Sequence, residues 1–63
     1  MNKTDEKPLL KPQEAACRLA ISLRTLWQLT QDGEIPCVRI KRLVRYDPAD
    51  ITAYIGRQKI NNN

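Results

Sequence analysis

ISLRTLWQLTQDGEIP, residues 21–36, carries the start, the buried edge and the end of one amphipathic helix. Ser22 offers a short side-chain oxygen that can accept a hydrogen bond from the first backbone N–H groups of a helix. Leu26 and Leu29 then recur at helical spacing and give the segment one apolar edge. Gly33 can take up the left-handed conformation that ends many helices. We therefore expect a helix between Ser22 and Gly33.

The polar side of this helix is unusual for a surface that only meets water. Arg24, Trp27, Gln28 and Gln31 point away from the apolar edge, and Arg24 and Gln28 share a face because they are four residues apart. An α-helix fits the major groove of DNA, where Arg and Gln side chains form paired hydrogen bonds with guanine and adenine. The pattern predicts a recognition helix over residues 22–32.

Composition sets limits on the fold and on the partner. A chain of 63 residues forms one small domain with a thin core. Eleven Lys plus Arg against seven Asp plus Glu give a net charge of +4 and a pI of about 9.4, which favours a polyanion such as nucleic acid. No apolar run is long enough to span a membrane, and the N-terminus lacks the apolar segment of a signal peptide. We expect a soluble, cytoplasmic protein that contacts no membrane.

Catalysis and metal binding are poorly supported. The chain has no His and no glycine-rich phosphate loop, and its carboxylates stand where helix caps explain them, so nothing resembles an acid/base pair or an activated nucleophile. Cys17 and Cys37 alone cannot complete a four-ligand zinc site. We interpret them as small, buried or half-buried hydrophobic residues in a reducing cytoplasm rather than as a disulfide or redox pair. We expect a non-enzyme with no cofactor and no metal.

A second, shorter helix precedes the recognition helix. Pro12 suits a first helical turn, where its missing N–H costs nothing, and the predicted helix runs over residues 12–19. Its cap position holds Lys11, a poor capping residue. A connection of about three residues joins the two helices, as in a helix-turn-helix. Residues 1–8 read as a flexible lead-in.

The next segment alternates between apolar and cationic residues, as a half-buried hairpin does. A three-residue loop over 41–43 would place Ile40 opposite Val44 and Val38 opposite Tyr46, with all four side chains on one face. A turn of only two residues would mix the faces, and it lacks the Asn-Gly pair that such turns favour. We therefore expect the longer loop.

That register gives the hairpin a cationic outer face. We call this hairpin, residues 37–46, the wing. Arg39 would lie directly across from Arg45, with Lys41 and Arg42 at the tip. Like charges in opposed positions repel, at a cost on the order of 0.2–1 kcal/mol, and a polyanion would remove that cost. The structural alternative is a solvated cationic edge that discourages aggregation between strands. The helix beside the wing favours binding.

A third helix closes the domain. Asp47 and Pro48 form a strong helix start, with an Asp cap and a proline at the first helical position. Gly56 either ends this helix or is crossed by it, and residues 61–63 should fray. Over residues 9–60 we expect a mainly α fold with a small β-hairpin, namely a winged helix-turn-helix with three helices. The expected core comprises Ala15, Ala16, Leu19, Ile21, Leu26, Leu29, Ile35, Val38, Ile40, Val44, Tyr46, Ile51, Tyr54 and Ile55.

The order of these pieces is more specific than any one of them. KPQEAACRLAISLRTLWQL, then DGEIP, then VRIKRLVRYDPADITAYI together resemble the MerR-type winged helix-turn-helix domain of the excisionase and AlpA-like family. The resemblance implies that the second helix enters the major groove and that the wing contacts the adjacent minor groove or the DNA backbone. By position, it assigns base reading to Leu23, Arg24, Thr25 and Gln28, and wing contacts to Arg39, Lys41, Arg42 and Arg45.

The roles of Trp27 and Thr25 each have two possible interpretations. Trp27 either flanks the core or donates from its indole to a DNA phosphate. Thr25 either touches phosphate or bonds a helix carbonyl. The wing also lacks the glycine that the family often has after the first strand.

The implied function is that of a sequence-specific DNA-binding protein of excisionase type. Such a recombination directionality factor, from a mobile element, bends DNA so that an integrase can assemble. Its implied partners are double-stranded DNA, an integrase or recombinase, and neighbouring protomers; no small-molecule effector is expected. A small AlpA- or MerR-like transcriptional regulator is the alternative within this class. A protein-interaction module that docks Trp27 and the leucines into a partner is the alternative from another class.

Overall fold

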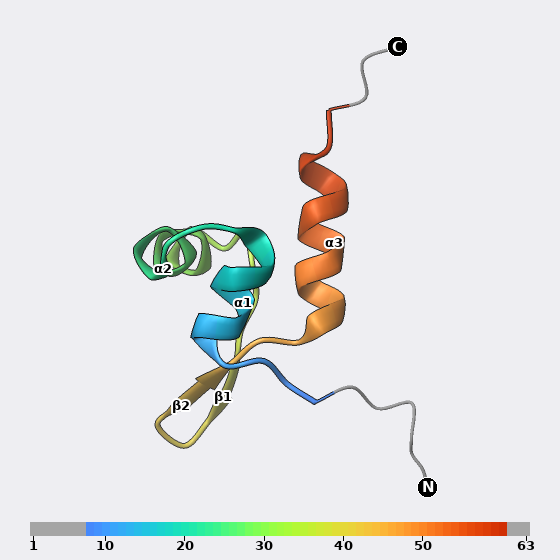
Figure 1. Ribbon diagram of the computed structural model, residues 1–63. Coiled ribbons are helices and arrows are strands. Elements are labelled where there is room, and N and C mark those ends of the chain that lie inside the picture. The colour runs from blue at the N-terminus through green and yellow to red at the C-terminus, as the bar shows by residue number, and fades with distance from the viewer. Residues whose placement is uncertain (1–7, 61–63) are drawn as a thin grey trace, which may run out of the picture.

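The computed structural model describes residues 8–60, which form three helices and one two-stranded antiparallel hairpin (Figure 1). In chain order the elements are α1 (Pro12–Leu19), α2 (Leu23–Gln31), β1 (Val38–Ile40), β2 (Leu43–Arg45) and α3 (Pro48–Gln58). This arrangement confirms the expected mainly helical, winged helix-turn-helix fold. The predicted lead-in over residues 1–8 and the predicted frayed tail over 61–63 lie outside the described residues, apart from Pro8.

The two helices of the helix-turn-helix end in the same backbone motif, although only one of them has a glycine there. At the end of α1, Ala20 has a φ of 58°, and the next N–H donates to the Ala16 carbonyl at 3.0 Å. At the end of α2, Gly33 has a φ of 82°, and the next N–H donates to the Leu29 carbonyl at 2.9 Å. Both are Schellman motifs. An alanine in the left-handed region is strained by its Cβ, whereas a glycine is not.

Side-chain oxygens accept hydrogen bonds from backbone N–H groups at the start of each helix. The Ser22 hydroxyl oxygen accepts from the Thr25 N–H at 3.1 Å at the start of α2, and the Asp47 carboxylate caps α3. At the start of α1 the cap residue itself contributes no such bond, but the Glu14 carboxylate accepts from the Lys11 N–H at 2.9 Å. Glu14 therefore offsets the poor capping residue in front of this helix.

The hairpin register differs from the expected one. The strands pair Val38 with Arg45, Arg39 with Val44, and Ile40 with Leu43. The turn therefore contains two residues rather than three, and its first residue, Lys41, has a φ of 56°, a region that such turns usually fill with Gly or Asn. The prediction is wrong because Tyr46 pairs with Leu10 instead of with β1. The Leu10 N–H donates to the Tyr46 carbonyl at 2.7 Å, and the Tyr46 N–H donates to the Leu10 carbonyl at 2.9 Å.

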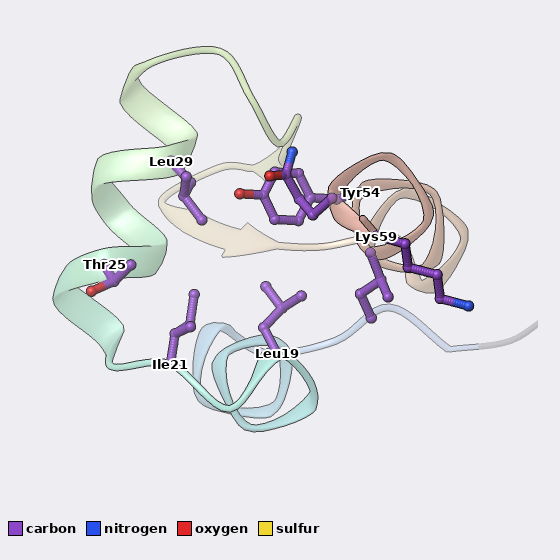
Figure 2. A pocket seen from close by; sticks show the side chains of 8 residues that line it. Leu19, Ile21, Thr25, Leu29, Tyr54 and Lys59 are labelled. Carbon is purple, nitrogen blue, oxygen red and sulfur yellow. The ribbon is translucent and has the colours of Figure 1, made fainter. Parts of the chain in front are cut away.

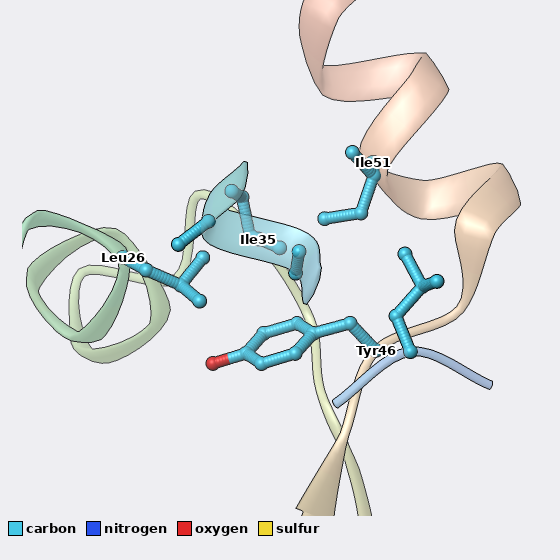
Figure 3. Packing of buried hydrophobic residues seen from close by; sticks show 7 residues of the cluster. Leu26, Ile35, Tyr46 and Ile51 are labelled. Carbon is cyan, nitrogen blue, oxygen red and sulfur yellow. The ribbon is translucent and has the colours of Figure 1, made fainter. Parts of the chain in front are cut away.

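The core gathers side chains from all three helices and from the segments that flank the wing (Figure 3). Tyr46 and Ile35 are 0% exposed, while Leu26 and Ile51 are each 1% exposed. Full burial of a large apolar side chain contributes roughly 1.5–3 kcal/mol, so these four side chains supply much of the stability. Within residues 8–60, the buried hydrophobic cluster comprises Leu10, Ala15, Ala16, Leu26, Ile35, Tyr46 and Ile51.

Three predictions about burial are wrong. Ile40, placed in the core by the expected register, is 46% exposed, because the two-residue turn directs it outward. Ile55 is 38% exposed, because it borders an open groove between helices. Cys17 is exposed, whereas Cys37 is half-buried, and both thiols are free. Leu10 joins the core without having been expected there, since its bridge to Tyr46 draws it inward.

The last helix continues through its glycine and packs against the first helix. α3 continues past Gly56 to Gln58, and it packs chiefly against α1 (Figure 1). Near its end, the Arg57 guanidinium donates to the Glu34 carbonyl at 2.8 Å and lies 5.6 Å from the centre of the Tyr54 ring. Arg57 thereby ties the end of α3 to the loop that follows α2.

Candidate nucleic-acid interface

The polar face of α2 is open to solvent. Arg24 and Gln28 are both exposed, and they lie about 40° apart around a helix of 3.6 residues per turn. Leu26, on the opposite side, is 1% exposed and anchors the helix in the core. The Ser22 cap fixes where the helix begins. This face therefore presents, in a defined orientation, two side chains that can each form paired hydrogen bonds with a base edge.

An apolar flank borders this face on one side. Leu23 is 39% exposed and Trp27 is 41% exposed, and their spacing of four residues places them together on the helix surface. Trp27 is therefore not a core residue. Its indole remains available both for van der Waals contact and as a hydrogen-bond donor.

Thr25 lies on the other flank of α2. The Ser22 hydroxyl donates to the Thr25 hydroxyl oxygen at 3.0 Å, in addition to the backbone cap. The Thr25 proton itself is therefore free to donate, for example to a phosphate. The threonine of α2 that bonds a helix carbonyl is Thr30, whose hydroxyl lies 2.8 Å from the Leu26 carbonyl oxygen.

The wing carries four cations, but not as one opposed pair of arginines. Arg39, Lys41 and Arg42 are exposed, whereas Arg45 is half-buried and donates to the Val44 carbonyl at 2.8 Å. Arg39 is paired with Val44, so Arg39 and Arg45 lie on opposite faces of the ribbon. The predicted pairing of Arg39 with Arg45 is wrong, and the repulsion expected from it does not arise.

One side-chain hydrogen bond, between Tyr46 and Thr30, joins the wing to α2. The Thr30 hydroxyl lies 2.8 Å from the Leu26 carbonyl oxygen and 2.8 Å from the Tyr46 hydroxyl. Because a carbonyl oxygen only accepts, Thr30 donates its single proton to Leu26, and Tyr46 donates to Thr30. Tyr46 directly follows β2 and is 0% exposed. The base of the wing is therefore bonded to the side of α2 that faces the core.

Sequence reasoning missed this link. Tyr46 is an expected core residue, but Thr30 looks like an ordinary polar position in a helix. Its one signal is that it lies next to Leu29 and four residues after Leu26, on the side of the helix that faces the core.

A groove of about 410 Å³ opens between α2 and α3 (Figure 2). Leu29 lies about 140° from Arg24 around α2, so the groove borders the side of α2 away from Arg24, with Thr25 at its edge. The groove is also a feature that the sequence did not predict, because its apolar residues match the pattern of a closed core. Its lining comprises Leu19, Ile21, Thr25, Leu29, Tyr54, Ile55, Gln58 and Lys59.

The polar side chains exposed on α2 and on the wing are hydrogen-bond donors and cations. In residues 8–60, no group of three or more His, Cys, Asp or Glu side chains could hold a metal ion. Among the helices of these same residues, none has both the length and the apolar character needed to cross a membrane. The chemistry available at the α2 face and at the wing is hydrogen bonding to base edges and charge pairing with phosphates.

Comparison with known proteins agrees with this geometry. A family model described as a helix-turn-helix domain matches residues 9–59, which include α1, α2, the wing and α3. No curated protein and no solved structure is significantly similar to the chain. The family match supports a DNA-binding role for this domain. The chain belongs to the helix-turn-helix domain family.

Proposed function

We propose that this protein is a sequence-specific DNA-binding protein of excisionase type. In this proposal α2 lies in the major groove and the wing reaches the adjacent minor groove or the backbone. The observation that carries it is the exposed pair of Arg24 and Gln28 on a capped helix, next to a cationic wing. The bond between Tyr46 and Thr30 joins the base of the wing to α2.

The side chains divide into two roles. On α2, direct contact with base pairs falls to Arg24 and Gln28, and Leu23 and Trp27 supply apolar contacts beside them. The Thr25 hydroxyl has a proton free to donate to a phosphate at the edge of the DNA major groove. The wing cations contact phosphates, which carry no base identity but set register and affinity. These wing cations are Arg39, Lys41, Arg42 and Arg45.

Binding to selected DNA tests this proposal. A duplex is first selected by the protein from a pool of random sequences, and its affinity is then measured over a range of salt concentrations. If all four wing cations contact phosphates, the slope of log K against log salt is about −3.6 from the wing alone, since each contact contributes about −0.9. Selection of no sequence, or an affinity that does not change with salt, would contradict the proposal.

The excision role adds a protein partner to DNA binding. It is supported by the resemblance to the excisionase and AlpA-like group and by the groove between α2 and α3, which stays uncovered when α2 faces DNA. A reconstituted recombination reaction, with an integrase encoded beside this protein and its attachment sites, tests the role. The protein should stimulate excision over integration. A footprint confined to the protein's own promoter, with no effect on recombination, would instead identify a transcriptional regulator.

The exposure of Trp27, at 41%, favours one second candidate from another class, a protein-interaction module. Tryptophan fluorescence separates the two. DNA binding by α2 predicts that the selected duplex protects Trp27 from iodide quenching. Protection by the integrase alone, with no protection by the duplex, would favour the interaction module.

A further inference from the structure

We propose that the wing tip is an apolar wedge, in which Ile40 and Leu43 enter the minor groove and kink the DNA at a flexible base step. The inference rests on the proposed DNA-binding function. It assigns to that function two residues that neither the charge pattern nor the family match singles out. It also names a feature of the target site.

The first observation is the placement of this pair. Ile40 and Leu43 are directly opposed across the hairpin, immediately before and after the turn. Ile40 is 46% exposed and Leu43 is 50% exposed. Within the helices and strands of residues 8–60, no other large hydrophobic side chain is more exposed. Their face of the ribbon is the one opposite Val44, which packs against the core.

The second observation is the charge around the pair. Lys41 and Arg42 form the turn between Ile40 and Leu43, and no Asp or Glu occurs in residues 35–46. An exposed apolar pair at the tip of a two-stranded sheet is an aggregation hazard. A protein partner would also meet two exposed cations there. The negative potential of a DNA minor groove attracts such cations, and Ile and Leu are among the side chains that architectural proteins insert between base pairs.

The third observation is the dimension of the tip. Paired strands lie about 4.8 Å apart before side chains are added, whereas the minor groove of B-DNA is only about 6 Å wide. Insertion therefore requires the groove to open, and a kink toward the major groove opens it. Pyrimidine–purine steps such as TA and CA kink at the lowest cost. The target site should consequently contain such a step beneath the wing.

The spacing of that step is fixed by the protein. Tyr46, which follows β2, is bonded to Thr30 on α2 at 2.8 Å. Tyr46 is also 0% exposed in the core, so the base of the wing is joined to the helix that carries Arg24 and Gln28. The flexible step should lie at one constant distance from the base pairs that α2 reads.

Energy transfer between dyes at the two ends of a DNA duplex tests the wedge. The probe is a duplex of about 30 base pairs that the natural chain has selected from a random pool. The variant Ile40→Thr/Leu43→Thr keeps side chains suited to strands but removes most of the apolar surface. Leu9→Thr is the matched control, because Leu9 is 37% exposed and lies outside the wing. Arg42→Gln removes one tip cation and leaves the apolar pair intact.

The expected results separate the wedge from simple charge pairing. The double variant should bind about tenfold more weakly, keep the salt slope of the natural chain, and return the energy transfer to that of free duplex. It should also lose the preference for TA over GC at the kinked step. Arg42→Gln should reduce the salt slope by about 0.9 and retain the kink, and Leu9→Thr should change neither.

Two outcomes would overturn the wedge alone. They are a natural chain that binds its selected duplex without bending it, and a double variant that bends the duplex as the natural chain does. If the natural chain selected no sequence at all, or bound without salt dependence, the wedge and the proposed function would both fail.

Discussion

Removal of the Thr30 hydroxyl should destabilise the domain more than removal of the Tyr46 hydroxyl. In Thr30→Val the Tyr46 hydroxyl, on a side chain that is 0% exposed, loses the acceptor that lies 2.8 Å away. An unsatisfied buried donor costs about 1–3 kcal/mol. In Tyr46→Phe the donor is removed instead. Thr30 is half-buried and still bonds the Leu26 carbonyl, so we expect the loss of only about 0.5–1.5 kcal/mol.

The double variant completes a thermodynamic cycle for this link. Thr30→Val/Tyr46→Phe leaves two apolar groups of nearly the same shapes, so it should cost less than the sum of the two single changes. We expect a coupling energy of about 1 kcal/mol. Urea unfolding followed by circular dichroism measures each value, and a change of 1 kcal/mol shifts the melting temperature of so small a domain by roughly 4–8 °C. Additive costs, or a Thr30→Val variant as stable as the natural chain, would refute the link between wing and recognition helix.

Three further changes test particular backbone and capping features by the same unfolding assay. Ala20→Gly should stabilise the domain by about 1 kcal/mol, since it relieves a Cβ from the left-handed region; destabilisation would argue against the Schellman turn after α1. Ser22→Ala should lower the free energy of unfolding by about 1 kcal/mol through loss of the α2 cap. An unchanged stability would mean that the bond from the Thr25 N–H to the Ser22 hydroxyl does not stabilise the helix. Lys41→Gly should stabilise the two-residue turn by several tenths of a kcal/mol or more while weakening DNA binding. A less stable Lys41→Gly variant would favour the longer loop.

The helices were predictable because their signals are local. Ser22 and Asp47 are caps that act on the residues next to them in the chain, and Gly33 takes the conformation that its lack of a Cβ permits. The bounds of α1 follow from Pro12 and from the end of the apolar pattern at Leu19. Such signals do not depend on contacts between distant parts of the chain, so the sequence alone sufficed for them.

The wing register was not predictable from the same kind of signal. Alternation within residues 37–46 favours a hairpin that buries four apolar residues on one face. The structure instead pairs Tyr46 with Leu10, which lies 36 positions earlier in the chain. This distant pairing takes Tyr46 out of the strand pairing with β1 and leaves a turn of only two residues. The first residue of that turn, Lys41, then has a positive φ. Contacts between distant residues decide register, and periodicity does not report them.

In the candidate site, too, some features follow from local spacing and others depend on contacts between distant residues. The exposure of Arg24 and Gln28 follows from helical spacing, and the structure places them as that spacing requires. The hydrogen bond that joins the wing to α2 is made to Thr30 and spans 16 residues of sequence, so no local pattern reports it. The groove between α2 and α3 depends on how closely the two helices approach, which an apolar pattern does not specify.

The central claim, that α2 reads bases while the wing holds phosphates, is tested most directly by one specificity measurement. Affinities of Gln28→Ala and Arg42→Ala for the selected duplex are compared with their affinities for a scrambled duplex at fixed salt. Gln28→Ala should lose about 1–3 kcal/mol of discrimination at a single base pair, while its affinity for scrambled DNA stays close to that of the natural chain. Arg42→Ala should weaken binding to both duplexes by the same factor. Loss of discrimination in Arg42→Ala, with Gln28→Ala as selective as the natural chain, would contradict the account.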